Sequence, residues 1–333
     1  MTSHSNNNPE SPLRHLTGHL PASPIVLLMG PTGAGKSAAA IALAHGLQTE
    51  IVSVDSSLVY RGLDIGAAKP NRSVRERIPH HLIDILDPAQ SYSAGQFVRD
   101  TEQAIASIRA RGRVPLLVGG TMLYFHALLN GLSELPEADP ELRHELDGRL
   151  AERGSAELHA ELARVDPEAA ARIHPNDPQR IQRALEVFYL TGLPITALQV
   201  ERRHPLAGQR TLKIVMSPGR RSDLHRRIEL RFGAMMAAGF LDEVRVLRSR
   251  PDLTATTPSM RAVGYRQLWA HLDGEFGLDE AIRRGIVATR RLAKRQLTWL
   301  RAVSAAHWID ADVDTAVEQI GGWLKAAVDA EGS

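Results

Sequence analysis

The segment Gly30-Pro31-Thr32-Gly33-Ala34-Gly35-Lys36-Ser37 fits the pattern G-x-x-x-x-G-K-[ST] of a phosphate-binding loop. The apolar run Ile25–Met29 precedes this segment, and the alanine-rich run Ala38–Leu47 follows it. A strand, a glycine loop and a helix in this order point backbone N–H groups and the positive helix end at an anion. Lys36 would reach the terminal phosphates, and the Ser37 hydroxyl would bind Mg²⁺. The motif predicts a polyphosphate or diphosphate ligand without distinguishing the two.

Short apolar runs alternate with segments of helical periodicity, which is typical of an α/β fold with a parallel sheet. The predicted strands are Ile25–Met29, Ile51–Val54, Leu82–Leu86, Val114–Val118 and Leu212–Met216. The predicted helices include Ala38–Leu47, Ala94–Arg111 and Leu224–Ala238. We therefore predict a P-loop NTPase-like parallel sheet core with a small inserted helical domain. In such sheets, ligands bind outside the carboxyl ends of the strands.

The polar residues that follow the predicted strands should therefore meet at one edge of the sheet. Besides the phosphate loop, they are Asp55-Ser56-Ser57, Gly119-Gly120-Thr121, Ser217, Arg220 and Arg221. Asp55 suits a magnesium ligand or a general base, although an aspartate that caps a turn is an alternative. Two glycines before Thr121 let the backbone approach a ligand closely. The Thr121 hydroxyl suits a ligand contact or a helix cap, and these two roles are compatible.

The domain organisation follows from a break in this alternation. Residues 137–208 are charged, helix-prone and punctuated by prolines. We expect them to form a helical insertion between two parts of the core, residues 24–136 and 209–325. Residues 1–23 are polar and lack the apolar segment of a signal peptide, so we expect a disordered tail.

Composition excludes several classes of protein. The 333 residues are 43% hydrophobic, with no apolar stretch of membrane-spanning length. The absence of cysteine excludes disulfides, thiolate zinc sites and a cysteine nucleophile. The 14 histidines lack HExxH spacing, which disfavours a zinc site. We expect a monomeric cytoplasmic protein that does not associate with membranes.

Charge is distributed unevenly along the chain. Residues 180–301 hold 23 Lys and Arg against 11 Asp and Glu, although the net charge of the whole chain is +2. This excess suggests a polyanionic partner, and solvated helix faces are the alternative. On a predicted helix over Asp279–Val303, four cations fall on one strip at 100° per residue. They are Arg283, Arg290, Lys294 and Arg301. This strip favours nucleic acid over a membrane surface, because the opposite face lacks a broad Leu, Phe and Trp surface.

Seven segments resemble, in order, the motifs of the tRNA dimethylallyltransferases, also called tRNA isopentenyltransferases. They are Asp55–Gly66, Pro79–Asp84, Tyr92–Phe97, Gly119–Tyr124, Asp177–Glu186, Val263–Gln267 and Lys294–Leu300. The resemblance runs from about residue 24 to residue 310. Eukaryotic relatives carry a carboxyl-terminal zinc finger, so a chain without cysteine resembles the bacterial type.

The resemblance implies a prenyl transfer. The phosphate loop would hold dimethylallyl diphosphate rather than ATP, with Mg²⁺ assisting the leaving group. N6 of the adenine at tRNA position 37, next to the anticodon, would attack the allylic carbon. Asp55 matches the family's general base, and Thr121 and Arg221 match residues at the diphosphate and its bridging oxygen. Lys36 and Ser37 keep their phosphate-loop roles.

The resemblance also implies a set of tRNA-binding residues. They are Asp55, Ser56, Ser57, Leu58, Thr121, Arg143, Gln179, Arg180, Ile181, Gln182, Arg183, Arg261, Gly264, Tyr265, Arg266, Gln267, Lys294, Arg295 and Arg301. Position 58 is leucine where many members carry glutamine. The residues alone leave two other functions open, a P-loop nucleotide or small-molecule kinase and an RNA-binding NTPase switch. The full-length resemblance favours the prenyltransferase over both.

Overall fold

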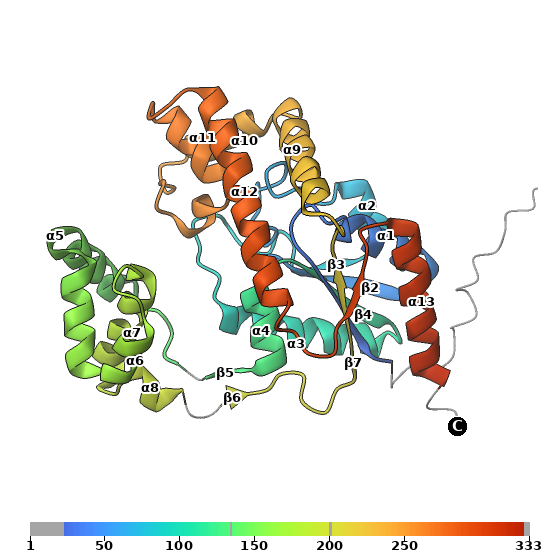
Figure 1. The fold of residues 1–333 in the computed structure, drawn as a ribbon, viewed down its shortest axis with the longest axis horizontal. Coiled ribbons are helices and arrows are strands. Elements are labelled where there is room, and N and C mark those ends of the chain that lie inside the picture. The colour runs from blue at the N-terminus through green and yellow to red at the C-terminus, as the bar shows by residue number, and fades with distance from the viewer. Residues whose placement is uncertain (1–22, 134, 200–201, 330–333) are drawn as a thin grey trace, which may run out of the picture. The chain divides into compact units, whose positions relative to one another are not determined.

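A computed structural model describes residues 23–133, 135–199 and 202–329 of the chain. Its main element is a six-stranded parallel sheet with the order β3-β2-β4-β1-β7-β8 (Figure 1). The strands are β1 (Ile25–Met29), β2 (Thr49–Val54), β3 (His80–His81), β4 (Val114–Gly119), β7 (Thr211–Met216) and β8 (His307–Ile309). The predicted α/β core is confirmed.

The sheet departs from the sequence prediction at both edges. The predicted strand Leu82–Leu86 is wrong, because β3 ends at His81 and the backbone then turns. Leu82 and Asp84 have φ values of 61° and 57°, in the left-handed region that interrupts an extended strand. At the other edge, the sequence analysis did not predict β8, which is only three residues long.

Helices cover the sheet because the strands of a parallel sheet are apolar on both faces. On one face, α1 (Lys36–Gly46) packs against α13 (Val313–Asp329), and Figure 1 shows the two side by side. Helix α3 (Ala94–Ala110) contacts β2 and β4. It begins with a capping box, in which Ser93 accepts from the Gln96 N–H and the Gln96 side chain accepts from the Ser93 N–H. Helix α4 (Met122–Asn130) follows β4.

Four helices contribute to a second apolar cluster, distinct from the one at the sheet. They are α9 (Arg221–Ala237), α10 (Phe240–Arg248), α11 (Tyr265–Leu272) and α12 (Leu278–Leu300). Phe240 is fully buried between Phe232 and Tyr265, with T-shaped contacts to both rings. Glu243 accepts the N–H groups of Asp64, Ile65 and Gly66, which holds this loop against the helices.

Residues His126–Pro205 form a second compact unit, and the described residues before and after them form the first. The second unit begins earlier than the predicted insertion of 137–208 and ends close to it. Its helices are α5 (Pro140–Val165), α6 (Pro167–Arg172), α7 (Pro178–Thr191) and α8 (Ile195–Leu198), and a short ribbon pairs β5 (Leu132–Ser133) with β6 (Arg202–Arg203).

The prolines of this unit mark where its helices begin. An aspartate caps each of α5, α6 and α7 by accepting a backbone N–H three residues later, and proline takes the first helical position. The caps are Asp139, Asp166 and Asp177. None of the helices in the described part of the chain is both long and apolar enough to cross a bilayer. The predicted tail falls almost wholly outside the described residues.

Candidate active site

A cavity of about 380 Å³ lies at the carboxyl ends of the central strands. It is lined by residues that follow three strands, namely Thr32 after β1, Asp55 after β2 and Thr121 after β4. Arg231 of α9 and Arg295 of α12 also line it. Much of the remaining wall is apolar and includes Met122, Leu123, Phe232, Met235, Phe240, Val263 and Leu292. We call this space the first cavity.

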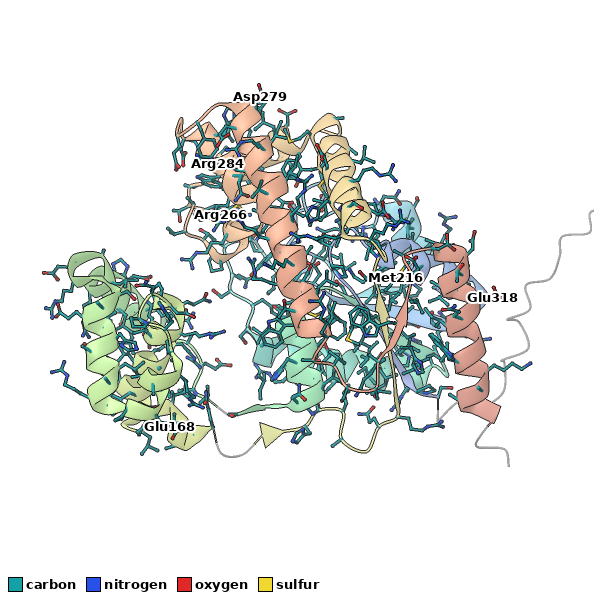
Figure 2. All side chains as sticks on the ribbon, viewed as in Figure 1. Glu168, Met216, Arg266, Asp279, Arg284 and Glu318 are labelled. Atoms are coloured by element: carbon teal, nitrogen blue, oxygen red, sulfur yellow. The ribbon has the colours of Figure 1, made fainter. Side chains whose placement is uncertain are left out.

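The phosphate loop has the backbone that its motif predicts. Gly35 is the N-cap of α1 with φ 93°, a left-handed conformation that favours glycine. The ammonium group of Lys36 folds back over the loop and donates to the carbonyl oxygens of Gly30 and Pro31, each at 2.8 Å. The Lys36 ammonium is therefore positioned to exchange two neutral carbonyl acceptors for the charged oxygens of a phosphate. The loop lies beside the end of β7, where Met216, labelled in Figure 2, approaches Gly30.

The pKa of Lys36 is lowered from 10.5 to about 7. Burial of the ammonium is the main cause, repulsion from Arg231 adds to it, and attraction to Asp55 opposes it. Burial also lowers the pKa of Arg231, against the attraction of Asp55. These mutual effects reflect how close the two cations lie to one another and to the Asp55 carboxylate. A dianionic ligand would reverse the balance by favouring the charged form of Lys36.

Binding of inorganic diphosphate should therefore take up a proton at pH 8. Free Lys36 is mostly neutral above its pKa of about 7, and the bound anion raises that pKa. At pH 6 the lysine is already charged, and its contribution to the uptake should vanish. Calorimetry in buffers of different ionisation enthalpy measures the uptake, and Lys36→Arg removes the titrating group. Equal uptake by wild type and Lys36→Arg at pH 8 would contradict this assignment.

Asp55 and Thr121 are held by backbone groups that leave part of each side chain available. One Asp55 oxygen, Oδ1, accepts the Ser57 N–H at 2.8 Å. Thr121 Oγ1 accepts the Ser56 N–H at 3.1 Å, so its hydroxyl hydrogen is available for another acceptor. The Thr121 N–H donates to the Val54 carbonyl, which ties the ends of β2 and β4 together. The structure thus brings these two predicted residues into one cavity, with Ser56 and Ser57.

Arg231 is a site residue that the sequence analysis missed. It lines the first cavity, and its charge acts on both Lys36 and Asp55. The predicted residue, Arg221, instead lines a different cavity, and its Nε contacts His225 Nε2 at 3.3 Å. Arg221 begins α9, and Arg231 lies about 15 Å further along the helix axis. The structure thus places Arg231, and not Arg221, in the cavity that holds Asp55 and Thr121.

A second cavity, of about 510 Å³, is lined by residues of α9, α12 and β8 and by the segment that follows β7. Four cations line it, namely Arg221, Arg290, Lys294 and Arg301. The cations of the predicted strip on α12 differ in their contacts, because two of them pair with carboxylates and two are exposed. Arg283 donates to Glu280 of its own helix, and Arg290 donates to Glu229 at 2.7 Å. Lys294 and Arg301 are exposed, whereas Arg295 belongs to the first cavity.

The predicted RNA-binding segment 261–267 contains both exposed and buried residues. Arg261 and Arg266 are exposed, and Figure 2 labels Arg266 on α11. Tyr265 is fully buried and donates its hydroxyl to Glu243, so its side chain is not exposed to a partner in this structure. Gln267 is also buried and accepts the N–H of Gly264. Leu58 is partly buried outside the lining of the first cavity.

In the second unit, buried Glu186 engages two of the predicted RNA-binding arginines. Arg143 Nε lies 2.8 Å from Glu186 Oε1, and Arg183 Nη1 lies 2.6 Å from Glu186 Oε2. Ile181 is fully buried in the apolar core of this unit, so its side chain is not exposed at the surface. Gln182 bonds within the unit to the Arg143 carbonyl and to Asp147. Gln179 and Arg180 are exposed at the start of α7.

The sequence profile of the family described as IPP transferase matches residues 58–303. A tRNA dimethylallyltransferase of Methylococcus capsulatus is 58% identical over 287 residues, which cover 86% of this chain and 92% of the relative. A tRNA dimethylallyltransferase of Halorhodospira halophila is 53% identical over 306 residues, covering 92% and 98% of the two chains.

Two solved structures resemble the fold. The full-length tRNA isopentenylpyrophosphate transferase of Bacillus halodurans is 36% identical, with a TM-score of 0.67. The similarity covers 93% of this chain and 100% of that one. A eukaryotic dimethylallyltransferase acting on tRNA is 27% identical, with a TM-score of 0.72, covering 87% of this chain and 74% of that one.

Proposed function

Because the chain belongs to the IPP transferase family, we propose that it transfers a dimethylallyl group to N6 of adenine at tRNA position 37. The donor is dimethylallyl diphosphate, and the products are N6-isopentenyladenosine and diphosphate. The observation that supports this assignment best is the first cavity, where Asp55, Thr121 and Arg231 meet beside the phosphate loop. These three residues come from one chain, so we propose that a monomer is active.

The reaction forms a bond between adenine N6 and the allylic C1 while the bond between C1 and the diphosphate oxygen breaks. The diphosphate leaves with the electron pair, and the N6 proton passes to the Asp55 carboxylate. An adenine amine is a poor acid, so the proton leaves as the new bond forms and the nitrogen becomes acidic. Lys36, Arg231 and the Thr121 hydroxyl would stabilise the charge that develops on the diphosphate.

We propose Mg²⁺ as the cofactor. Ser37 offers a hydroxyl oxygen in the first turn of α1, next to Lys36. Mg²⁺ in phosphate sites is commonly held by one or two protein oxygens together with substrate phosphates, so this donor fits. Bound there, the ion would neutralise part of the diphosphate charge. The Ser37 hydroxyl would be a ligand of the ion, and the Lys36 ammonium would place a positive charge beside the diphosphate.

We propose that the target adenine leaves the anticodon-loop stack to reach Asp55. Asp55 and Thr121 line a cavity at the carboxyl ends of the strands, which a base would enter by leaving the stack of its loop, and flipping costs a few kcal/mol. A further cavity, of about 580 Å³, shares Arg231 and Met235 with the first cavity. Because these two cavities share two lining residues, we propose that they form one channel, in which the adenine and the diphosphate would approach Arg231 from different sides.

Binding of an anticodon stem-loop should depend steeply on salt. Removing two exposed cations with Lys294→Ala/Arg301→Ala should lower the slope of log K against log salt by about 0.7–0.9 per lost phosphate contact. The matched control Arg77→Ala/Lys325→Ala removes two exposed cations outside both cavities and should change the slope little. Fluorescence anisotropy over a salt series measures both. The same slope for both double variants would show that α12 is merely solvated.

Mass spectrometry of nucleosides tests the function directly. The purified protein should convert a tRNA anticodon stem-loop to its N6-isopentenyladenosine form with dimethylallyl diphosphate and Mg²⁺, and EDTA should stop the reaction. ATP should not be required and should not be hydrolysed. ATP turnover without prenylated product would instead support the kinase alternative.

A further inference from the structure

The buried side chain of Gln296 joins two loops of the site. Gln296 lies on α12 and is only 7% exposed. Its Oε1 accepts the Thr32 N–H of the phosphate loop at 2.9 Å. Its Nε2 donates to the carbonyl oxygen of Gly120 at 2.7 Å. One amide group therefore bonds the loop after β1 and the loop after β4 at the same time, from a helix far along the chain.

Gln296 approaches the backbone of Gly120 closely. A Cβ atom at Gly120 would lie 2.6 Å from Gln296 Nε2, closer than real side chains tolerate. The next residue is Thr121, whose hydroxyl oxygen accepts the Ser56 N–H next to Asp55. Two hydrogen bonds of Gln296, the peptide bond between Gly120 and Thr121, and the Thr121–Ser56 hydrogen bond thus connect the phosphate loop to the residue beside Asp55. Every residue in this connection lines the first cavity.

We infer that Gln296 is a positioning residue, which sets the phosphate loop and the Thr121 loop in register so that leaving group and acceptor are aligned. The inference rests on the proposed function for the reaction that it serves. The amide suits this task because it presents one donor and one acceptor in a fixed plane. Small displacements between reacting groups have large effects on the rate, since productive geometry is narrow.

This role predicts a particular split of kinetic parameters. Gln296→Met keeps a similar volume and leaves the Thr32 N–H and the Gly120 carbonyl unpaired. The value of kcat should fall by about 10- to 100-fold, the effect expected for losing paired buried polar groups in a transition state. The affinity for inorganic diphosphate should stay within a few-fold of wild type, because each loop keeps its own ligand groups. A merely structural glutamine would lower the melting temperature and leave kcat of the folded enzyme unchanged.

Gln209→Met is the matched control. Gln209 accepts a hydrogen bond from Arg109, which is 100 residues away in the chain, and it lines neither the first nor the second cavity. The same chemical change at this position should affect stability alone. Equal kcat values for Gln296→Met and Gln209→Met, after correction for the folded fraction, would overturn the inference.

Gln296→Glu adds a test that depends on pH. A carboxylate keeps the acceptor for the Thr32 N–H but sets an oxygen against the Gly120 carbonyl oxygen. A protonated carboxyl restores both bonds, and burial raises the pKa of such a group. The ratio of the variant's kcat to that of wild type should therefore rise as pH falls. A ratio independent of pH between 5 and 8 would contradict the role of the donated hydrogen bond.

Hydrogen exchange separates this inference from the proposed function. Inorganic diphosphate bound at the phosphate loop should slow amide exchange in the segment Gly119–Tyr124 of the wild type. The same ligand should slow exchange in that segment less in Gln296→Met, because only the direct contact of the Thr121 hydroxyl with the diphosphate remains. This coupling is measurable even if the wild type transfers no prenyl group, an outcome that would refute the function alone. Equal protection in both proteins would refute the role of Gln296.

Discussion

Replacing Asp55 with asparagine should lower the rate of prenyl transfer by about 100-fold or more, the scale of a lost general base. Asparagine keeps the size of the side chain and one oxygen for the Ser57 N–H, which Asp55 Oδ1 accepts at 2.8 Å. It cannot take the proton that adenine N6 releases as the carbon–nitrogen bond forms. Single-turnover kinetics with saturating stem-loop measures the chemical step, and fluorescence anisotropy should show that the stem-loop still binds.

Asp87→Asn is the control for this substitution. Asp87 pairs with Arg250 at 2.7 Å and lies outside the first and second cavities. The same chemical change there should leave the single-turnover rate close to wild type. Near-normal turnover of Asp55→Asn would exclude Asp55 as the base, whatever its effect on RNA affinity.

Replacing Arg231 with glutamine should lower kcat by about 10²- to 10³-fold, the range seen when a fixed group that stabilises developing charge is removed. The guanidinium lines the first cavity and is close enough to Asp55 and Lys36 to shift the pKa of Lys36. Its loss should therefore also raise the pKa of Lys36, because one source of repulsion is gone. The proton uptake on diphosphate binding should move to higher pH, which calorimetry detects.

Arg221→Gln compares the two arginine assignments. Arg221 lines the second cavity, so the structure predicts a smaller loss of kcat for this variant than for Arg231→Gln. Steady-state kinetics of the two variants under the same conditions gives the answer. A larger loss for Arg221→Gln would restore the assignment made from the sequence and refute the one made from the cavity.

Local patterns predicted the parts of the site that follow strands. The phosphate loop, Asp55 and Thr121 each come directly after an apolar run, and parallel strands bring such positions to one edge. Arg231 could not be singled out from the sequence, because α9 also carries Arg221, Arg226 and Arg227. Residue type alone does not say which of these faces a cavity. The burial of Ile228 and Phe232 on either side of Arg231 supplies that information only once the helix is packed.

Contacts between residues far apart in the chain are also beyond local sequence patterns. The resemblance implies RNA contacts for Arg143 and Arg183, and the structure pairs both with buried Glu186, which is 43 residues from Arg143. Gln296 lies within the motif Lys294–Leu300, and no spacing rule predicts that its amide would join the loops after β1 and β4. The failed strand prediction at Leu82 has a local cause, because a left-handed residue interrupts an apolar run.

The most direct test of the account is a crystal structure of the protein with an anticodon stem-loop and a non-reactive analogue of dimethylallyl diphosphate. We predict that the adenine next to the anticodon is flipped into the first cavity, with N6 within hydrogen-bond distance of the Asp55 carboxylate. The diphosphate should lie on the phosphate loop and contact Arg231. An adenine that remains stacked in its loop, beyond hydrogen-bond reach of Asp55, would contradict both the flipped base and the role of Asp55.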